Sequence, residues 1–267
     1  MSRRVLITGG GSGLGRELAR LCLARGDRVA IADIHAPRLT ATADELGDSV
    51  LAIHLDVTKA EQWQHAMETL HNQWGGLDLL VNNAGIASGG PMQAESVENW
   101  QRVIDINLLG VVRGAQAAHQ LLAQSQGQLL NVASMAGLIH PPMMGSYNAV
   151  KAAVVAYSET LAFEWEPEHI GVHVLCPGFF ATNLAESLPD SDPALKAVIE
   201  RVFAKARMTA TDVAQVALRG LENGDFLILS HPEGKQAHRL KRWFPTSLYR
   251  QVMKKQTRGL LKAWKQQ

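Results

Sequence analysis

The sequence has only two cysteines among its 267 residues, and they lie far apart, at Cys22 and Cys176. Neither belongs to a CxxC pair or to the spacing of a zinc site, so we expect two free buried thiols and no metal centre. This scarcity argues against a disulfide-stabilised secreted domain and favours a reducing compartment.

Long hydrophobic runs are also missing. No stretch approaches the roughly 18 consecutive apolar residues of a transmembrane helix. The apolar run Val5–Ile7 is too short for a signal-peptide core, and no cleavage site follows it. We therefore expect a cytoplasmic protein. Aromatic residues make up only 6% of the chain, while 46% of the residues are hydrophobic, which is enough for one large core of mainly aliphatic side chains.

Acidic residues are absent from the C-terminal part of the chain. The whole sequence has 26 Lys and Arg against 25 Asp and Glu, yet residues 235–267 contain ten Lys or Arg and no Asp or Glu. We divide the chain into a domain at residues 1–234 and a basic amphipathic extension at residues 235–267. The extension carries no recognised nucleic-acid-binding motif, so we expect no nucleic-acid partner.

Short apolar runs alternate with longer amphipathic stretches through most of the sequence. The runs are rich in Val, Ile and Leu without polar alternation, which is typical of parallel strands buried on both faces. The pattern predicts an α/β fold, a single doubly wound Rossmann-type domain with a parallel sheet of about seven strands flanked by helices. The predicted strands are Val5–Thr8, Arg28–Asp33, Ser49–Leu55, Leu77–Asn82, Gln128–Ala133, Val172–Cys176 and Phe226–Ser230, and the predicted helices lie near 14–26, 37–46, 59–74, 96–123, 146–166, 194–206 and 211–223.

A glycine-rich turn follows the first predicted strand and opens a helix. Its pattern, from Thr8 to Gly15, is T-G-x-x-x-G-x-G. Glycines let the backbone approach a pyrophosphate closely, and a helix N-terminus adds free N–H donors and a positive dipole end. The turn thus predicts a dinucleotide site, although an ordinary strand–helix loop would have similar glycines.

Asp33 ends the second predicted strand, where a carboxylate can accept hydrogen bonds from the adenosine ribose hydroxyls and repel a 2′-phosphate. The next basic residue after it is Arg38. This balance favours NAD(H) as the cofactor and leaves NADP(H) as an alternative.

Several further motifs occur in order along the chain, and together with the glycine turn they resemble those of the short-chain dehydrogenase/reductase family. The resemblance extends to about residue 232. It rests on Thr8–Gly15, Asp56-Val57 after the third strand, Asn82-Asn83-Ala84-Gly85 after the fourth, Asn107 in a helix, Ser134 after the fifth strand, Tyr147-x-x-x-Lys151, and Pro177-Gly178 with Thr182 after the sixth strand.

Tyr147 and Lys151 are four residues apart in a predicted helix, so they share one face. A tyrosine of pKa about 10 is a poor base at neutral pH, but a nearby ammonium stabilises the phenolate and lowers its pKa. We expect Lys151, together with the positive charge of an oxidised nicotinamide, to lower the pKa of Tyr147 enough for it to act as general acid and base.

The resemblance implies an oxidoreductase that transfers a hydride between a nicotinamide cofactor and an alcohol, ketone or aldehyde. Ser134 would orient the substrate oxygen, Lys151 would also bind the nicotinamide ribose, and Asn107 would anchor a water in a proton relay. The cofactor-binding residues that we predict are Thr8, Gly9, Gly11, Ser12, Gly13, Leu14, Gly15, Asp33, Asp56, Val57, Asn83, Ala84, Gly85, Tyr147, Lys151, Pro177, Gly178 and Thr182.

The substrate pocket should be apolar. The segment between Ser134 and Tyr147 contributes Met135, Leu138, Ile139, Pro141, Pro142, Met143 and Met144, and the segment after Thr182 resembles the family's substrate lid. Neither stretch has an Arg or Lys before Lys196, so a lipophilic alcohol or carbonyl compound fits better than a sugar phosphate. The resemblance also implies a homodimer or homotetramer built through the helices near 96–123 and 146–166.

Two other functions remain open. A sugar-nucleotide epimerase shares the Tyr-x-x-x-Lys motif, but the residues after Thr182 leave little room for its C-terminal domain. A sensor or scaffold that binds NAD(H) without catalysis would not need Ser134, Asn107, Tyr147 and Lys151 together.

The extension predicts a basic amphipathic helix at residues 246–265. Leu248, Tyr249, Val252, Met253, Leu260 and Trp264 share one face of it, with Lys and Arg on the other. Such a helix can lie peripherally on an anionic membrane, or its apolar face can pack on the domain or on a neighbouring subunit.

Overall fold

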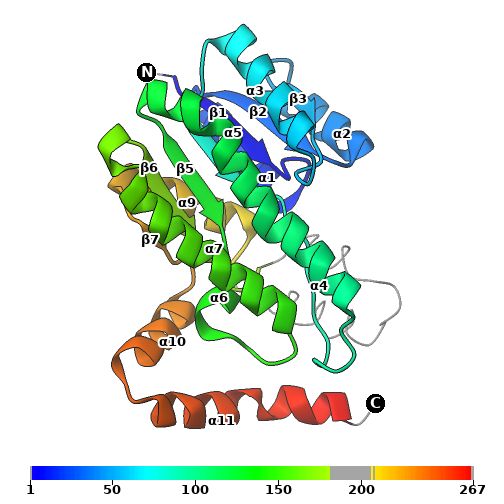
Figure 1. The fold of residues 1–267 in the computed structure, drawn as a ribbon, viewed down its shortest axis with the longest axis vertical. Helices are drawn as coiled ribbons and strands as arrows, with labels where there is room; N and C mark the ends of the chain where they lie inside the picture. The colour runs from blue at the N-terminus through cyan, green and yellow to red at the C-terminus, as the bar shows by residue number, and fades with distance from the viewer. Residues whose placement is uncertain (1, 181–205, 207, 266–267) are drawn as a thin grey trace.

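A seven-stranded parallel sheet lies between two layers of helices in the computed structural model, which describes residues 2–180, 206 and 208–265 (Figure 1). The strand order β3-β2-β1-β4-β5-β6-β7 is that of a doubly wound fold, as the sequence predicts. The strands are β1 (Arg4–Thr8), β2 (Arg28–Asp33), β3 (Leu51–His54), β4 (Leu79–Asn82), β5 (Gln128–Val132), β6 (Gly171–Leu175) and β7 (Leu227–Ile228).

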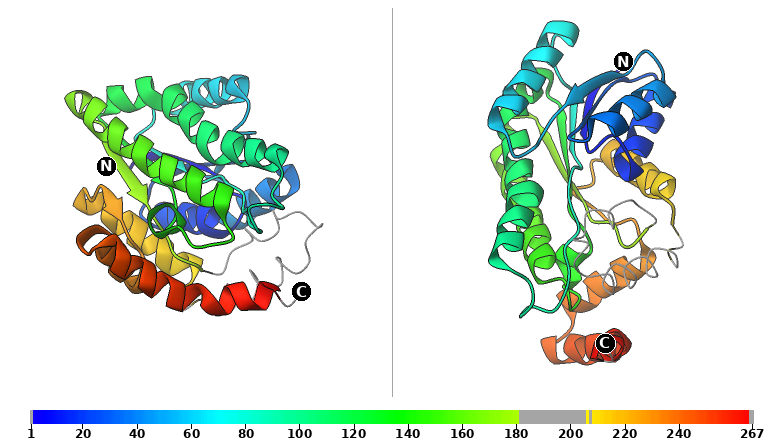
Figure 2. Two further views of the ribbon diagram at one scale, coloured as in Figure 1. Left: turned by 60° about the horizontal axis from the view of Figure 1, so that its bottom comes forward. Right: turned by 90° about the vertical axis from the view of Figure 1, so that its right-hand side faces the viewer.

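Helices cover both faces of the sheet (Figure 2). One layer contains α1 (Gly13–Ala24), α2 (Ala36–Leu46) and α9 (Ala210–Asn223), and the other contains α3 (Ala60–Trp74), α5 (Gly110–Ser125) and α7 (Gly145–Glu164). Successive side chains of β1 point to opposite faces of the sheet and pack on different helix layers. Ile7 packs with Leu18 and Val213 on the first side, whereas Leu6 packs with Trp63 and Leu161 on the second. Burial on both faces is the physical reason why these strands lack polar alternation.

Among the described residues, the predicted elements are confirmed with small shifts at their ends, and one prediction is wrong. The stretch near 96–123 is not a single helix, because α4 (Val97–Ile104) and α5 are separated by the π-helical turn η1 (Asp105–Leu109). Such turns occur mainly at functional sites, and Asn107 lies in this one. The predicted helix near 194–206, Thr182 and the proposed lid lie outside the described residues.

The parallel strands direct their carboxyl ends toward one edge of the sheet, where the chain turns in opposite directions after β1 and β4. This switch point is where doubly wound folds bind their ligands. The short helix α6 (Ala136–Ile139) lies at the same end, followed along the chain by α7 and the 3₁₀ turn η2 (Glu166–Glu168).

The C-terminal extension forms two helices beyond this edge (Figure 1). Helix α10 (Pro232–Trp243) begins shortly before residue 235, and α11 (Thr246–Lys265) coincides with the helix predicted there. Within the part of the chain that the structure describes, no helix is long and apolar enough to cross a bilayer.

Candidate active site

The glycine turn between β1 and α1 is a cradle that larger residues would fill. Gly9 and Gly13 have φ of +62° and +52°, in the left-handed region that favours glycine. A Cβ on Gly15 would lie 2.2 Å from the Gly9 carbonyl oxygen. Ser12 makes no side-chain cap, and the first turn of α1 has no acidic residue, so its N–H groups can meet a pyrophosphate. The turn fits a nicotinamide dinucleotide.

Thr8 and Asn83 support this cradle through their own hydrogen bonds. The Thr8 hydroxyl accepts hydrogen bonds from the backbone N–H groups of Asn83 and Ala84, both at 3.0 Å. The Asn83 amide donates to the carbonyl oxygens of Thr8 and Gly9, at 2.8 and 3.2 Å. These bonds join the ends of β1 and β4 and fix the path of the glycine turn beside Gly85.

Asp33 lies beside the glycine turn at the end of β2. Its carboxylate accepts hydrogen bonds from the backbone N–H of Gly11, at 3.1 Å, and from that of His35, at 3.0 Å. A Cβ on Gly11 would lie 2.9 Å from this carboxylate and 3.2 Å from the Cγ of Arg38. The carboxylate that we expect to bind the ribose thus lies beside the glycine turn, and Arg38 is close to the same place.

Asp56 and Val57 follow β3 and shape the start of α3. The Asp56 carboxylate accepts hydrogen bonds from the backbone and side chain of Thr58, at 2.9 and 2.8 Å. The Val57 carbonyl accepts a bond of 3.1 Å from the buried indole of Trp63. Both residues hold the loop that would face an adenine.

Tyr147 and Lys151 lie one turn apart on α7, and both are buried. The Lys151 ammonium donates a hydrogen bond of 2.8 Å to the Val132 carbonyl at the end of β5 and lies 5.7 Å from the centre of the Tyr147 ring. Burial lowers the pKa of Lys151 to about 8. Burial also raises the pKa of Tyr147 to about 12, against a smaller lowering by its hydrogen bond to Ser134. The predicted lowering of the Tyr147 pKa is therefore not present in the protein alone.

Ser134 follows β5 and begins a short turn. Its hydroxyl oxygen accepts a hydrogen bond of 3.1 Å from the backbone N–H of Ala136, and its side chain is hydrogen-bonded to the Tyr147 phenol. The two hydroxyl groups that the sequence assigns to the substrate oxygen are thus adjacent.

Asn107 lies in η1 and is fully buried, and both the nitrogen and the oxygen of its side-chain amide bond to the backbone of Ile86. Its nitrogen donates to the Ile86 carbonyl at 2.9 Å, and its oxygen accepts from the Ile86 N–H at 2.8 Å. A Cβ on Gly85 would lie 3.1 Å from this oxygen and 3.8 Å from the Lys151 ammonium. Asn107 and Lys151 therefore both lie close to Gly85, and Asn107 fixes the loop after β4.

Pro177 and Gly178 follow β6, and their backbone groups are already hydrogen-bonded. The Pro177 carbonyl accepts from the N–H of Met135 at 2.8 Å, and the Gly178 N–H donates to Nδ1 of His231 at 3.0 Å. His231, which the sequence did not single out, also bonds through Nε2 to the Phe179 carbonyl at 3.1 Å. It ties this loop to the end of β7.

A second polar cluster that the sequence did not reveal lies at the N-terminus of α7. The Glu95 carboxylate accepts hydrogen bonds from the Ser146 hydroxyl, from the Ser146 N–H at 3.3 Å and from the Ser88 hydroxyl at 2.5 Å. Asn99 donates to the same carboxylate at 2.9 Å. Because Ser146 precedes Tyr147, this cluster anchors the turn of helix that carries Tyr147.

The apolar segment between Ser134 and Tyr147 divides in two. Met135 and Leu138 are buried in a cluster with Val154 and Val174, so they belong to the core. The half-buried residues, which are available to line a pocket, are Ile139, Pro141, Pro142, Met143 and Met144.

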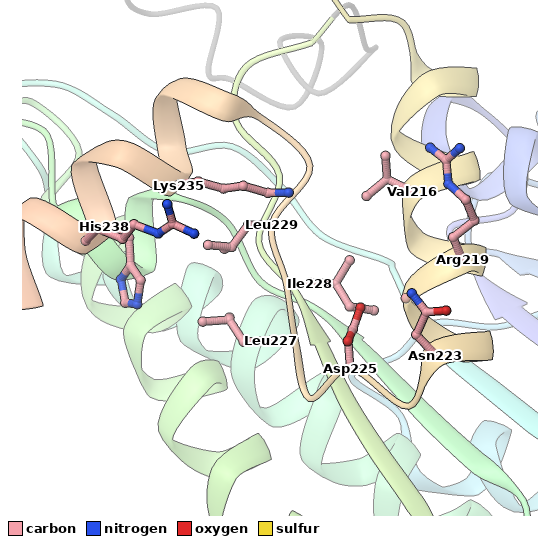
Figure 3. Close-up of a pocket in the computed structure, with 11 residues that line it drawn as sticks. Val216, Arg219, Asn223, Asp225, Leu227, Ile228, Leu229, Lys235 and His238 are labelled. Carbon is pink, nitrogen blue, oxygen red and sulfur yellow. The ribbon is translucent and has the colours of Figure 1, made fainter.

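A separate groove lies between α9, β7 and α10 (Figure 3). Arg219, Asp225, Lys235 and His238 are among the residues along it, and no predicted site residue lines it. Among residues 2–180, 206 and 208–265, no three His, Cys, Asp or Glu side chains are grouped to hold a metal ion.

Comparison with known proteins gives a consistent result. The sequence model of the family described as short chain dehydrogenase matches residues 3–193. The chain is 35% identical over 186 residues to a 3-alpha-(or 20-beta)-hydroxysteroid dehydrogenase of Mycobacterium bovis, covering 69% of this chain and 72% of that protein. It is 33% identical over 251 residues to a CLA biosynthesis dehydrogenase/reductase of Lactiplantibacillus plantarum, covering 86% and 88%.

A solved structure is similar over most of the chain. It is a short chain dehydrogenase/reductase from Burkholderia phymatum in complex with NAD, with a TM-score of 0.85 and 31% identity, covering 90% of this chain and 92% of that one.

Proposed function

Because this chain belongs to the short chain dehydrogenase family of oxidoreductases, we propose that it interconverts a lipophilic alcohol with its ketone or aldehyde. The observation that carries the proposal is the hydrogen bond between Ser134 and Tyr147 beside the buried ammonium of Lys151. This arrangement brings a proton carrier, a second hydroxyl for the substrate oxygen and a cation to one point at the carboxyl edge of the sheet.

Each residue has one task in the proposed reaction. Ser134 donates a hydrogen bond to the substrate oxygen, and Tyr147 takes the hydroxyl proton during oxidation and returns it during reduction. The chemistry that an oxidised nicotinamide would supply when bound is a hydride acceptor for the carbinol carbon and a positive charge. Lys151 binds the nicotinamide ribose and adds a second positive charge beside the phenol.

Because the pKa of Tyr147 is raised in the protein alone, the positive charge of the cofactor is needed to lower it. A phenol of pKa about 12 is protonated at neutral pH. Each unit by which its pKa is lowered requires about 1.4 kcal/mol of preferential stabilisation of the phenolate. Two cations in a site without water can supply several such units, because charges interact strongly at low dielectric.

We propose NAD(H) as the preferred cofactor and NADP(H) as the alternative. Asp33 lies at the glycine turn, where its charge opposes a 2′-phosphate. Arg38 lies at the same place and could partner that phosphate, which is why the alternative is kept.

The lipophilic substrate is argued from the pocket side. The half-buried residues there, Ile139 and Pro141 to Met144, are all apolar, and the polar His140 between them is exposed. The two curated relatives carry names that refer to a steroid and to CLA biosynthesis. A sugar-nucleotide epimerase remains less favoured for want of a C-terminal domain, and a non-catalytic NAD(H) sensor would not need the Ser134–Tyr147–Lys151 arrangement.

A screen of hydrophobic secondary alcohols and ketones tests the proposal. Each compound is offered with NAD(H) and with NADP(H), and the absorbance of the reduced nicotinamide is followed. Turnover of at least one compound that is lost in Tyr147→Phe is expected. Cofactor binding without turnover of any compound would favour the sensor.

We further propose a homodimer or homotetramer formed through α5 and α7. Phe163 on α7 is 72% exposed, and Leu109, the residue just before α5, is 40% exposed, and both are large apolar side chains for a monomer to leave in water. Light scattering that reports a monomer at micromolar concentration would contradict this assembly.

The outward face of α11 is proposed as a peripheral contact with anionic membranes. Arg250, Lys254, Lys255 and Arg258 are exposed on it, and the extension has no acidic residue. Trp243, the last residue of α10, and Phe244, which follows it, are 76% and 53% exposed. Each cation near an anionic membrane contributes about 1 kcal/mol to binding, and exposed aromatic rings favour the boundary between the membrane and water.

A further inference from the structure

The catalytic serine and the C-terminal extension hold opposite ends of one short helix. Helix α6 spans only Ala136–Ile139, and its first N–H, that of Ala136, donates to the Ser134 hydroxyl oxygen at 3.1 Å. The Ser134 hydroxyl thus holds the first N–H of α6 through a local bond to the residue two positions on, while the N-cap residue itself, Met135, makes no side-chain cap. A shift of α6 would move this hydrogen bond and with it the hydroxyl that faces Tyr147.

The other end of α6 is held by two side chains from the extension. The Lys241 ammonium of α10 donates a hydrogen bond of 2.6 Å to the Leu138 carbonyl. The Tyr249 hydroxyl of α11 donates a hydrogen bond to the Ile139 carbonyl. The last carbonyls of a helix have no partners within it, and a cation is favourable at this negative end of the dipole.

These two contacts are part of a wider connection. Lys241 also lies 3.0 Å from Nδ1 of His140, which ends α6 in the left-handed conformation, and 5.9 Å from the ring centre of Tyr249. Gly234 at the start of α10 packs so closely on Met135 that a Cβ there would lie 2.7 Å from its sulfur.

Helix α6 transmits such a constraint because it packs directly on α7. A Cβ on Gly137 would lie 2.6 Å from the backbone carbonyl oxygen of Lys151, so the two helices touch at the backbone. On α11, Tyr249, Val252 and Met253 are half-buried, while Arg250, Lys254, Lys255 and Arg258 are exposed. The half-buried side chains thus lie on the side of α11 that faces the domain, at the end where α6 lies (Figures 1 and 2).

We propose that Lys241 and Tyr249 are positioning residues, which hold Ser134 in place for the reaction by capping the C-terminus of α6. This inference rests on the proposed function for its kinetic consequences. The C-terminal extension then helps to position the active site, because its two hydrogen bonds hold the helical turn that follows Ser134.

The first test measures the turn itself and needs no substrate. Tyr249→Phe and Lys241→Met each remove one donor, and both are combined in a double variant. Hydrogen exchange is followed at the N–H groups of residues 137–140, which bond to the carbonyls of Ser134, Met135 and Ala136. We expect exchange in the double variant to be at least about tenfold faster, since each lost bond contributes roughly a factor of five. Exchange equal to that of the parent overturns the capping.

The second test measures the position of Ser134. Three groups surround the Tyr147 phenol. They are Ser134, which follows β5, Lys151 on the same helix, and Cys176, which follows β6. Tyr249→Phe changes none of these groups and removes no charge. If Ser134 moves away, its lowering of the Tyr147 pKa is lost. The acid limb of kcat/KM for alcohol oxidation should then shift to higher pH by about half a unit.

Steady-state kinetics completes the test. The double variant should lose about tenfold in kcat with its NADH affinity unchanged, because the cofactor cradle is formed by other elements. Lys241→Arg keeps a donor and should restore most of the rate. Lys235→Met, on the exposed side of α10, is the matched control and should behave as the parent.

The outcomes separate the two proposals. Faster exchange with an unchanged pH profile and rate overturns positioning, because the contacts would then be only structural. A parent protein that turns over no alcohol or ketone contradicts the proposed function, whereas the exchange measurement still tests the cap.

Discussion

The ammonium nitrogen of Lys151 lies 5.7 Å from the centre of the Tyr147 ring, while it donates a hydrogen bond to the Val132 carbonyl. The strand β5 therefore holds the cation in place beside the phenol. Because burial raises the pKa of Tyr147 and lowers that of Lys151, neither group is tuned for catalysis by the protein alone. The predictions below follow from this site and from its supports.

Tyr147→Phe should abolish turnover and keep cofactor binding. In the proposed reaction the phenolic oxygen exchanges the substrate proton, and general acid–base groups contribute about 10²- to 10⁴-fold. The rate of alcohol oxidation and the affinity for NADH are measured side by side. Tyr157→Phe, on the same helix but in the core cluster, is the control. A Tyr147→Phe rate within about threefold of the parent rate would contradict the assignment, because a threefold loss is far smaller than the loss expected for a general acid–base group.

Asp33→Ser combined with Ile34→Arg should shift the preference from NAD to NADP. The change removes the carboxylate beside the glycine turn and adds a cation for the 2′-phosphate. The ratio of kcat/KM for the two cofactors is the measurement. If the unaltered protein already prefers NADP by about tenfold, or 1.4 kcal/mol, the interpretation of Asp33 is wrong.

Glu95→Ala should lower both stability and turnover, because Ser146, Ser88 and Asn99 lose their shared acceptor. Unpaired buried polar groups cost about 1–3 kcal/mol each, although Ser88 and Ser146 can still bond to each other at 2.9 Å. Urea unfolding and kcat are compared with Glu95→Gln, which keeps one acceptor oxygen and should be milder. Equal losses in the two variants would count against a role for the carboxylate.

Stability should fall as the pH drops from about 7 toward 5. His173 and His231 each accept a hydrogen bond on one ring nitrogen, and burial lowers the pKa of both below the usual 6.5. The unfolded chain therefore binds protons more readily. The stabilisation is fully present above about 6.5 and is lost as the pH falls through the lowered values.

Urea unfolding at about pH 7.5 and 5.5 measures this loss. Glu17 and Asp78 are carboxylates with a lowered pKa, and their contribution to stability is lost only at more acidic pH. They therefore do not add to the loss measured in this range. A free energy of unfolding that is constant across this range would refute the prediction.

The full chain should co-sediment with anionic vesicles at low salt and not with neutral ones. Lys254→Gln combined with Lys255→Gln and Arg258→Gln removes three exposed cations of α11 and should weaken binding, at about 1 kcal/mol each. The triple variant should keep its activity, since none of these residues contacts α6 in the described hydrogen bonds. No binding by the parent would refute the membrane contact.

Local patterns predicted most of the fold. Runs of Val, Ile and Leu indicated all seven strands, and the order of motifs placed Ser134, Tyr147 and Lys151 at one edge. Both inferences succeed because strand burial and the carboxyl-edge rule depend on short segments and on the parallel order alone. Helix α11 was predicted for the same reason, from its own periodicity.

The sequence by itself thus determined the parallel sheet and the family, and it indicated the residues that we propose to meet the substrate oxygen. Only the tertiary structure revealed the π-helical turn at Asn107, the Glu95 cluster and the caps that Lys241 and Tyr249 place on α6. Glu95 is 51 residues from Ser146, and Lys241 is 103 residues from Leu138. Contacts over such separations leave no periodicity or spacing in a single sequence, because they arise only when distant segments pack against one another.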